Sequence, residues 1–281
     1  MTKKTVEESI ADALELPDIA LIKYLPYIFQ DFWELGSSSE EFIKIIWKHK
    51  EGYSSLNVLD LGSGKGAVSI KIASELGCRC FGIDAVEDFV NHSINKAKEY
   101  AVSDKCDFET NDVRVRVKSL GRYDIIILGA IGRVFGDYFD TLTTLQSHLK
   151  EGGLIIIDDA YIEDDCEKEY GNIYKKGDVI RQIHEAGMEL VEIVRVDGND
   201  STTPYPSNLD GNFCNDTYEG EYQNIQKRCM ELAEKHPEDR ELFIKYIDDQ
   251  KEEYRILSEE IVPVIFVVAI SDCLIVRENT F

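Results

Sequence analysis

The chain has 281 residues, of which 43% are apolar, and its formal net charge is −23. This length suits one large domain or a core with substantial insertions. The negative charge repels phosphate backbones and anionic membranes, so it argues against nucleic acid and membranes as partners. A cationic or neutral small molecule, or another protein, is easier to accommodate.

The N-terminal part is predicted to be helical. Residues 5–16 have helical periodicity and end at Pro17. Residues 18–36 are dense in aromatic side chains, and a second helix follows residues 37–39, where a serine hydroxyl can cap the first turn. We treat residues 1–50 as an N-terminal helical cap.

Beyond residue 50, short apolar runs alternate with amphipathic helical segments. The predicted strands cover residues 57–61, 80–83, 106–109, 124–128, 154–157 and 189–195. The predicted helices cover residues 66–76, 87–101, 136–149 and 177–186. This alternation is typical of a parallel sheet covered by helices on both faces.

The composition changes after residue 197. Residues 198–217 read as a polar loop, two helical patterns follow, and residues 262–270 (VPVIFVVAI) are predicted to be a last buried strand. The insert at 198–260 has 16 Asp and Glu and 7 Lys and Arg, a net charge of −9. Such a segment is usually a solvated helical face; our sharper hypothesis is a lid over the substrate.

The most informative segment is VLDLGSGKGAVSIKIA at residues 58–73. An apolar strand enters a turn with three glycines, Gly62, Gly64 and Gly66, and a helix follows at once. Glycine lets the backbone turn tightly and approach a ligand closely. The start of the helix presents N–H groups to that ligand. The segment therefore predicts a site for a nucleotide-like molecule.

Two kinds of nucleotide site compete at this stage. Gly62, Gly64 and Ala67 satisfy the dinucleotide pattern G-x-G-x-x-[GA], and Asp84 lies at about the spacing of a ribose-binding acid. A P-loop requires G-K-[ST], whereas Lys65 is followed by Gly66, so this motif is absent from the sequence.

Acidic residues recur where predicted strands end. Asp60 precedes the glycines, Asp84 ends the second strand, and Asn111, Asp112 and Val113 follow the third. Asp84 can accept from both ribose hydroxyls, and Asp112 from the amine of adenine. A dinucleotide site gives no reason for Asp112. The plain alternatives are turn or helix caps at Asp84 and Asp112, and a surface acid at Asp60.

Together these residues resemble the class I S-adenosylmethionine-dependent methyltransferases. The resemblance covers residues 56–197 and 262–275, about half of the chain. It implies an α/β fold with three layers, a Rossmann-like seven-stranded mixed sheet whose last strand is antiparallel and inserted between the preceding two. It also implies S-adenosyl-L-methionine as the cofactor and S-adenosyl-L-homocysteine as its product.

By position, the resemblance assigns the methionine part of the cofactor to Asp60 and the glycine turn, the ribose to Asp84, and adenine to Asp112 and Val113. The complete predicted cofactor set is Asp60, Gly62, Ser63, Gly64, Gly66, Asp84, Ala85, Asn111, Asp112, Val113 and Gly129.

Three candidate catalytic residues, Asp158, Asp159 and Tyr161, come just past the predicted fifth strand. A hydroxyl acceptor needs a base or a metal, whereas an amine needs only its neutral form. Metal-dependent catechol-type methyltransferases also want an Asp near the end of the fourth strand, where this chain has Gly129-Ala130. We therefore expect no metal. The alternative role of the two acids is to cap nearby N–H groups.

The candidate substrate pocket consists of Tyr24, Tyr27, Phe32 and Trp33. In the family that the chain resembles, segments before the first strand commonly close over the sulfonium, and aromatic faces suit a cation. These residues could equally belong to the core.

The seven cysteines are odd in number and form no C-x-x-C pair, which favours reduced thiols. The N-terminus lacks the apolar core of a secretory leader. We expect a cytoplasmic protein, with a homodimer as an open alternative to a monomer.

The predicted organisation is a single methyltransferase domain, 1–281, with a cap at 1–50, a core at 51–197 and 261–281, and the insert at 198–260. The expected activity is methyl transfer to a small molecule (EC 2.1.1.-), with N-, O- and C-methylation all open. The alternatives are an NAD-dependent oxidoreductase and a non-catalytic, regulatory module that binds S-adenosylmethionine.

Overall fold

The computed structural model describes residues 4–171, 173–196 and 215–271. The chain forms two compact units, Met1–Trp33 with Asp197–Val262, and Glu34–Val196 with Pro263–Phe281. The larger unit contains the sheet, and the smaller unit is built from helices. Most of the loop predicted at 198–217 lies outside the described residues.

The larger unit is organised around a seven-stranded sheet with the order β3-β2-β1-β4-β5-β7-β6. Its strands are β1 (Asn57–Leu61), β2 (Arg79–Asp84), β3 (Cys106–Thr110), β4 (Tyr123–Gly129), β5 (Leu149–Tyr161), β6 (Met188–Arg195) and β7 (Val262–Ile270). The pairs among β1 to β5 are parallel, whereas β6 and β7 are antiparallel. The seven-stranded mixed sheet and the insertion of the last strand between the preceding two are thus confirmed.

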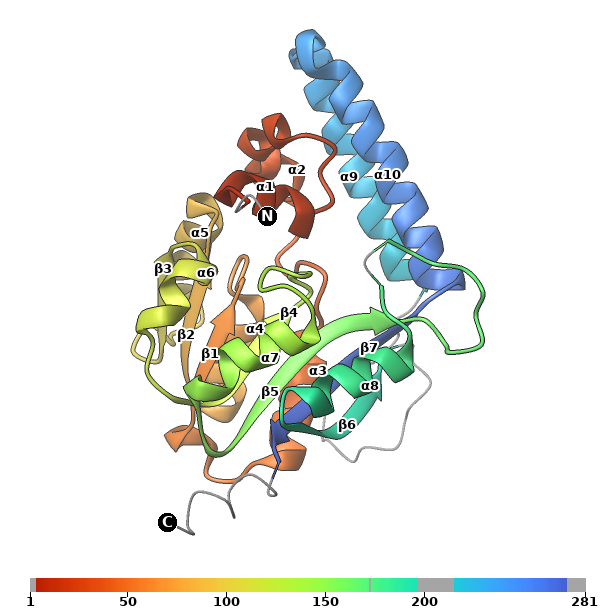
Figure 1. Cartoon of the computed structure of the whole chain (residues 1–281). Helices are drawn as coiled ribbons and strands as arrows, with labels where there is room; N and C mark the ends of the chain where they lie inside the picture. Colours follow the sequence, from red (N-terminus) through yellow and green to blue (C-terminus); the bar gives the residue numbers. More distant parts are fainter. Residues whose placement is uncertain (1–3, 172, 197–214, 272–281) are drawn as a thin grey trace. The chain divides into compact units, whose positions relative to one another are not determined.

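Helices lie on both faces of this sheet (Figure 1). They are α3 (Ser39–His49), α4 (Ala67–Leu76), α5 (Glu87–Glu99), α6 (Val113–Arg116), α7 (Tyr138–Leu145) and α8 (Lys176–Glu185), with 3-10 turns at Tyr53–Ser55, Val117–Ser119 and Gln146–His148. Helix α3 packs on α4, α5 on β3 and α8 on β6. Because both faces are covered, central residues such as Leu59 and Ile126 are completely buried, and the central strands consist mostly of apolar residues.

Strand β5 is longer than the sequence predicts. Its ladder with β4 continues through the pair of Gly129 and Asp158, so hydrogen bonding carries the strand beyond its apolar stretch. Asp158, Asp159 and Tyr161 lie within the strand, and the prediction that they come just past its end is wrong.

The smaller unit combines the N-terminal helices with the insert. It contains α1 (Val6–Ala13), α2 (Leu25–Ile28), α9 (Asn215–Lys235) and α10 (Arg240–Glu259), with 3-10 turns at Ile19–Tyr24 and Pro237–Asp239. Helices α9 and α10 pack together, and α2 contacts α9. The guanidinium of Arg228 forms two bonds to Asp31, at 2.6 and 2.8 Å, and so ties the insert to the N-terminal segment.

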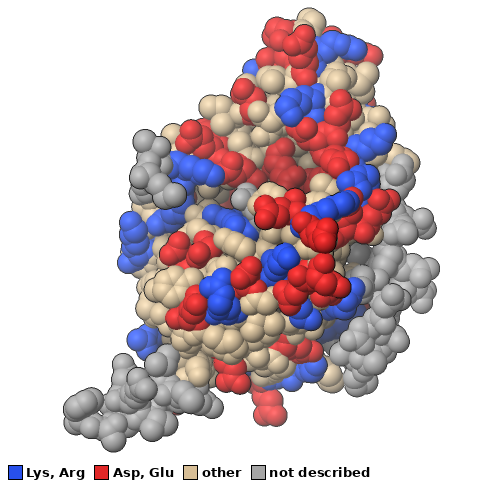
Figure 2. Space-filling view, turned by 45° about the vertical axis from the view of Figure 1, so that its right-hand side comes forward, with Lys and Arg blue, Asp and Glu red and all other residues tan. Residues whose placement is uncertain are grey.

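Charged side chains of both signs are interspersed on the face drawn in Figure 2. On α10, Lys245 pairs with Asp249 and Arg255 pairs with Glu252, at the spacings that bring helical side chains together. In the described parts of the chain, no helix combines the length and the apolar character that crossing a bilayer would require.

Candidate functional site

The turn between β1 and α4 depends on glycine for conformation and for space. Gly62 and Gly66 both have a φ of +74°, in the left-handed region that residues with a Cβ rarely adopt. A Cβ on Gly62 would collide with Cγ2 of Ile131, and one on Gly66 would lie 2.8 Å from the Cβ of Ser93. The turn therefore brings its backbone against neighbouring elements as closely as glycine allows.

The N–H groups of this turn are engaged within the protein. Gly62 and Ser63 both donate to the carbonyl oxygen of Ile83, at 2.8 and 3.0 Å, and Gly64 donates to Oδ2 of Asp84 at 2.8 Å. These bonds fasten the turn to the end of β2. The N–H groups of Gly62, Ser63 and Gly64 are thus engaged within the protein. The carbonyl oxygens of the turn each have two lone pairs, and those of Ser63 and Gly64 use one to accept from Gly66 and Ser93.

Asp84 and Asp60 flank the turn. Asp84 also accepts from the N–H of Val86 at 2.8 Å, and each carboxylate oxygen keeps a lone pair for a further donor. Asp60 is 2% exposed and accepts from the Ser69 hydroxyl at 2.7 Å, and burial raises its pKa to about 6. Asp60 is therefore not a surface acid. Asp84 caps the turn after β2, which is the alternative that the sequence left open, and it can still accept further hydrogen bonds.

The polar residues after β3 contact their own neighbours. Asp112 caps α6 through the N–H of Arg114 and also pairs with its guanidinium, each at 2.9 Å. Asn111 donates to Glu109 at 2.9 Å, and Val113 is buried. Any contact of Asp112 with adenine therefore has to coexist with Arg114.

The end of β4 lies against the segment before α3. A Cβ on Gly129 would lie 3.0 Å from Oγ of Ser37, and a Cβ on Gly36 would lie 3.1 Å from that of Ala130. Ser37 is 9% exposed, and its hydroxyl forms no hydrogen bond of good geometry in the described parts of the chain, although it is near enough to Asp158 to lower the pKa of that carboxyl. The sequence treats residues 37–39 only as potential helix caps, so this polar group next to the fourth strand is missed.

The two acids of β5 have unequal surroundings. Oδ2 of Asp159 accepts from the Tyr138 hydroxyl at 2.6 Å, and Oδ1 accepts from the N–H of Ala160 at 2.8 Å. Burial raises the pKa of Asp159, while the Tyr138 hydrogen bond opposes that rise. Burial raises the pKa of Asp158 to about 7, and repulsion by Asp159 adds to the shift. Asp158 is therefore the acid that exchanges its proton near neutral pH.

A pocket that is open to solvent lies beside these carboxylates. Its walls are the ends of β4 and β5, the loop after β4 and the first turn of α7. The lining residues are Leu128, Ile131, Gly132, Arg133, Phe135, Gly136, Asp137, Tyr138, Thr141, Ile157, Asp158 and Asp159. Because Ile131 also lies against Gly62, the pocket adjoins the glycine turn.

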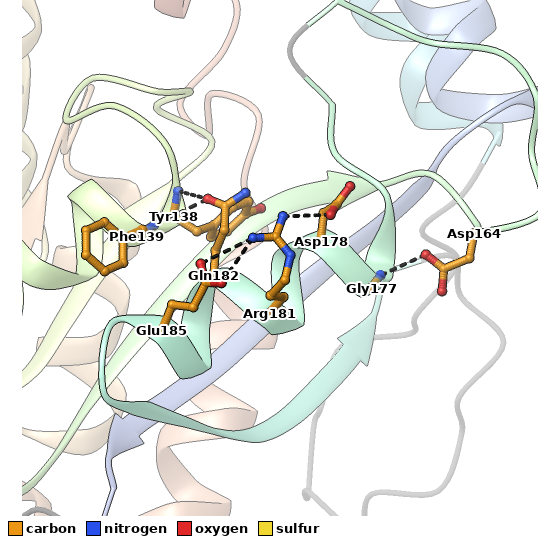
Figure 3. Close-up of polar contacts among 8 residues, drawn as sticks. All are labelled: Tyr138, Phe139, Asp164, Gly177, Asp178, Arg181, Gln182 and Glu185. Carbon is orange, nitrogen blue, oxygen red and sulfur yellow. Dashed lines mark hydrogen bonds and ion pairs between the residues drawn. The ribbon is translucent and has the colours of Figure 1, made fainter.

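Helix α8 supports Tyr138 from behind. Figure 3 shows the Gln182 side chain reaching from α8 to the start of α7. Its Oε1 accepts from the N–H of Tyr138 at 3.0 Å and from that of Phe139 at 3.4 Å, and Gln182 is buried. The ring of Tyr138 packs edge-on against Phe266 of β7. Tyr138, which donates to Asp159, is thus held by its backbone N–H and by its ring.

Tyr161, the third candidate catalytic residue, has different neighbours from the two acids. Its ring is buried near Phe266, with ring centroids 6.4 Å apart, and its hydroxyl is 3.4 Å from Oε1 of Glu163. The ammonium of Lys176 lies 5.2 Å from the ring centre. The structure therefore brings Asp158 and Asp159 together at the pocket, whereas the ring of Tyr161 packs near Phe266.

The N-terminal aromatic residues are engaged within the smaller unit. The hydroxyl of Tyr24 donates to Asp239 at 2.9 Å, and that of Tyr27 donates to Glu231 at 2.6 Å. Phe32 packs on Phe29, with ring centroids 5.9 Å apart, and Trp33 is partly exposed. Tyr24 and Tyr27 thus join the N-terminal helices to the insert.

Comparison with known proteins identifies the family. The model of the methyltransferase domain family matches residues 53–259. A hybrid PKS-NRPS synthetase of Talaromyces variabilis, pvhA, is 28% identical over 181 residues, which is 58% of this chain. The chain covers only 4% of that synthetase.

Solved structures share the fold. A SAM-dependent methyltransferase from Thiobacillus denitrificans, in complex with S-adenosyl-L-homocysteine, has a TM-score of 0.69 at 17% identity, covering 89% of this chain and 98% of that one. One from Geobacter sulfurreducens with the same ligand has a TM-score of 0.69 at 18% identity and the same coverage. The Rossmann-like methyltransferase fold predicted from the sequence is confirmed, and the chain belongs to the methyltransferase domain family.

Proposed function

We propose that the protein transfers the methyl group of S-adenosyl-L-methionine to a small-molecule acceptor. The observation that carries this proposal is the adjacency of the glycine turn and the pocket, which share Ile131. A ligand at the turn and an acceptor near Asp158 would then be neighbours. The S-adenosyl-L-homocysteine held by the two bacterial methyltransferases supports the same cofactor.

The residues of the turn fit an adenosyl-sulfonium ligand. Carbonyl oxygens at the turn can accept from an ammonium group, and the spare lone pairs of Asp84 can accept from ribose hydroxyls. We assign the cofactor site to Asp60, Gly62, Ser63, Gly64, Gly66, Asp84, Ala85, Asn111, Asp112, Val113 and Gly129. The bond that Asp60 accepts from Ser69 connects the end of β1 to α4, on the two sides of the turn.

When bound, the cofactor supplies a methyl group whose bond to sulfur breaks as a bond to the acceptor atom forms. Asp158 takes the proton that the acceptor loses onto a carboxylate oxygen. A pKa of about 7 suits a base that works near neutral pH. The walls of the pocket hold the acceptor in line, and such positioning is a large part of catalysis by displacement.

Asp159 supports this base through its charge. The hydrogen bond from Tyr138 favours the ionised form of Asp159, and that charge raises the pKa of Asp158. Tyr161 has a packing role in this scheme, since its hydroxyl points to Glu163. The lid function of residues 198–260, the substrate role of the N-terminal aromatics, the cytoplasmic location and the homodimer stay predictions.

Binding of S-adenosyl-L-homocysteine tests the proposal directly. Calorimetry should show one site, and saturation should raise the melting temperature through linkage. Asp84→Ala should weaken binding by about 1–3 kcal/mol, because it removes a charged hydrogen-bond acceptor. Asp107→Asn, which changes an exposed acid on β3, serves as the matched control.

Two results would contradict the proposal. A protein that ignores S-adenosyl-L-homocysteine but binds NADH with a change in fluorescence would be an oxidoreductase. A protein that binds the methyltransferase product yet consumes no S-adenosyl-L-methionine with any acceptor would be a regulatory module.

A further inference from the structure

Arg133, in the loop after β4, differs from the arginines around it. Arg114 and Arg116 of the same unit each pair with a carboxylate. Arg133 forms no ion pair or hydrogen bond within residues 4–171, 173–196 and 215–271. Its guanidinium lies over the ring of Tyr174, and its charge lowers the pKa of Asp159. The chain has 54 acidic and 31 basic residues, so a guanidinium on a pocket wall that forms no direct ion pair with a described residue is unusual.

Tyr174 holds Arg133 in place. The guanidinium carbon lies 3.6 Å from the centre of the Tyr174 ring, which itself lies 6.0 Å from the ring of Tyr138. At this separation the guanidinium lies over the face of the ring. A stacked guanidinium is preorganised, so it loses little freedom when it binds an anion.

The pocket selects among anions. A guanidinium matches either a carboxylate or a phosphate with two parallel hydrogen bonds. Asp158 and Asp159 line the same pocket, and the whole chain carries a charge of −23. Both conditions oppose the second negative charge of a phosphate monoester. A carboxylate, with one negative charge, is the better match.

We propose that Arg133 binds a carboxylate group of the methyl acceptor, so that the acceptor is a small carboxylic acid carrying the amine or hydroxyl to be methylated. This inference rests on the proposed function. The acceptor would be held by its carboxylate at Arg133 and would present its proton-bearing atom to Asp158, and two such contacts fix its orientation. Arg133 and Asp158 line the same pocket, so one small molecule can contact both.

The test uses the full chain saturated with S-adenosyl-L-homocysteine and three matched pairs of probes. These are glycine and glycinamide, anthranilate and anthranilamide, and salicylate and salicylamide. At least one carboxylate should bind about 10- to 100-fold more tightly than its amide. The neutral amide cannot form a hydrogen bond with the guanidinium in which both the donor and the acceptor are charged. Equal affinities within all three pairs would overturn the inference.

Variants of Arg133 test whether this residue causes the preference for a carboxylate over its amide. Arg133→Gln should abolish the preference for the carboxylate, and Arg133→Lys should keep part of it, because the charge remains while the planar fork is lost. Arg122→Gln, at an exposed position in the same unit, should behave like the natural protein. A preference that survives in Arg133→Gln would overturn the assignment.

Binding of S-adenosyl-L-homocysteine distinguishes a failure of the proposed function from a failure of the role of Arg133. All three variants should bind it as tightly as the natural protein, which also shows that they are folded. Loss of this binding in the natural protein would refute the proposed function. Retained binding without a carboxylate preference would refute only the role of Arg133.

Discussion

The hydroxyl of Tyr138 donates a hydrogen bond of 2.6 Å to the carboxylate of Asp159. The two residues lie 21 positions apart in the chain, and the bond joins the first turn of α7 to the end of β5. It stabilises the charged form of Asp159 inside a pocket where burial favours the neutral form. The neighbouring Asp158 has a pKa of about 7 partly because of that charge.

Asp158→Asn should lower kcat by about 10²- to 10⁴-fold, the usual contribution of a general base, if proton removal limits the reaction. The affinity for S-adenosyl-L-homocysteine should stay unchanged. In the natural protein, kcat/KM should rise with pH through an apparent pKa near 7, because only the ionised Asp158 can accept a proton. Steady-state rates across pH check both points, with Asp107→Asn as the control. An unchanged kcat in Asp158→Asn would refute its role as the base.

Asp60 should give stability a specific dependence on pH. Its pKa rises from 3.8 to about 6 on folding, so between these values the folded protein keeps a proton that the unfolded chain has released. Its contribution to the free energy of unfolding therefore falls as pH rises, by up to about 1.4 kcal/mol per pH unit. Asp60→Asn lacks this term, so urea unfolding should show its stability relative to the natural protein increasing across that window. A constant difference would contradict the shift.

Gly62→Ala should destabilise the protein for two separate reasons. The positive φ costs about 1–2 kcal/mol for a residue with a Cβ, and the new Cβ would collide with Ile131. Gly152→Ala is the matched control, because Gly152 has a φ of +67° and, among the described residues, no heavy atom within 4 Å of an added Cβ. Denaturant unfolding should show the larger loss for Gly62→Ala. Equal losses would mean that Ile131 moves aside without penalty.

Gln182→Leu should lower the free energy of unfolding by about 1–3 kcal/mol, because it leaves the buried N–H of Tyr138 without its acceptor. Its neighbour Arg181 pairs with Asp178 and Glu185 in an exposed position (Figure 3). Arg181→Gln should therefore change stability by less than about 1 kcal/mol. Unfolding of the two variants under the same conditions compares them, and similar losses would argue against the supporting role of Gln182.

Much of the fold could be predicted because the core strands are continuous apolar runs that can be recognised in the sequence. The apolar runs around Leu59 and Ile126 are buried on both faces, so their pattern needs no knowledge of partners. The end of β5 was missed because backbone pairing with Gly129 extends the strand through polar residues. Hydrophobic patterns do not record such pairing.

The sequence predicts only those parts of the candidate site whose residues have a characteristic spacing along the chain. The glycine turn and Asp84 are read from spacing, because they lie at the ends of successive strands. The pairs of Tyr138 with Asp159 and Arg133 with Tyr174 join residues that are far apart in sequence. No local pattern links such partners, and only the folded arrangement of loops brings them together.

The close approach of Gly36 and Ala130 matters for protein engineering. Gly36 lies close to the Cβ of Ala130, and α3 packs on α4, so a segment cut just before the first strand would lose packing next to the end of β4. A transplantable catalytic unit therefore has to begin at or before Glu34. The segment that matches this chain forms 4% of the pvhA synthetase, so the same boundary can be tested when that segment is cut out of its longer chain.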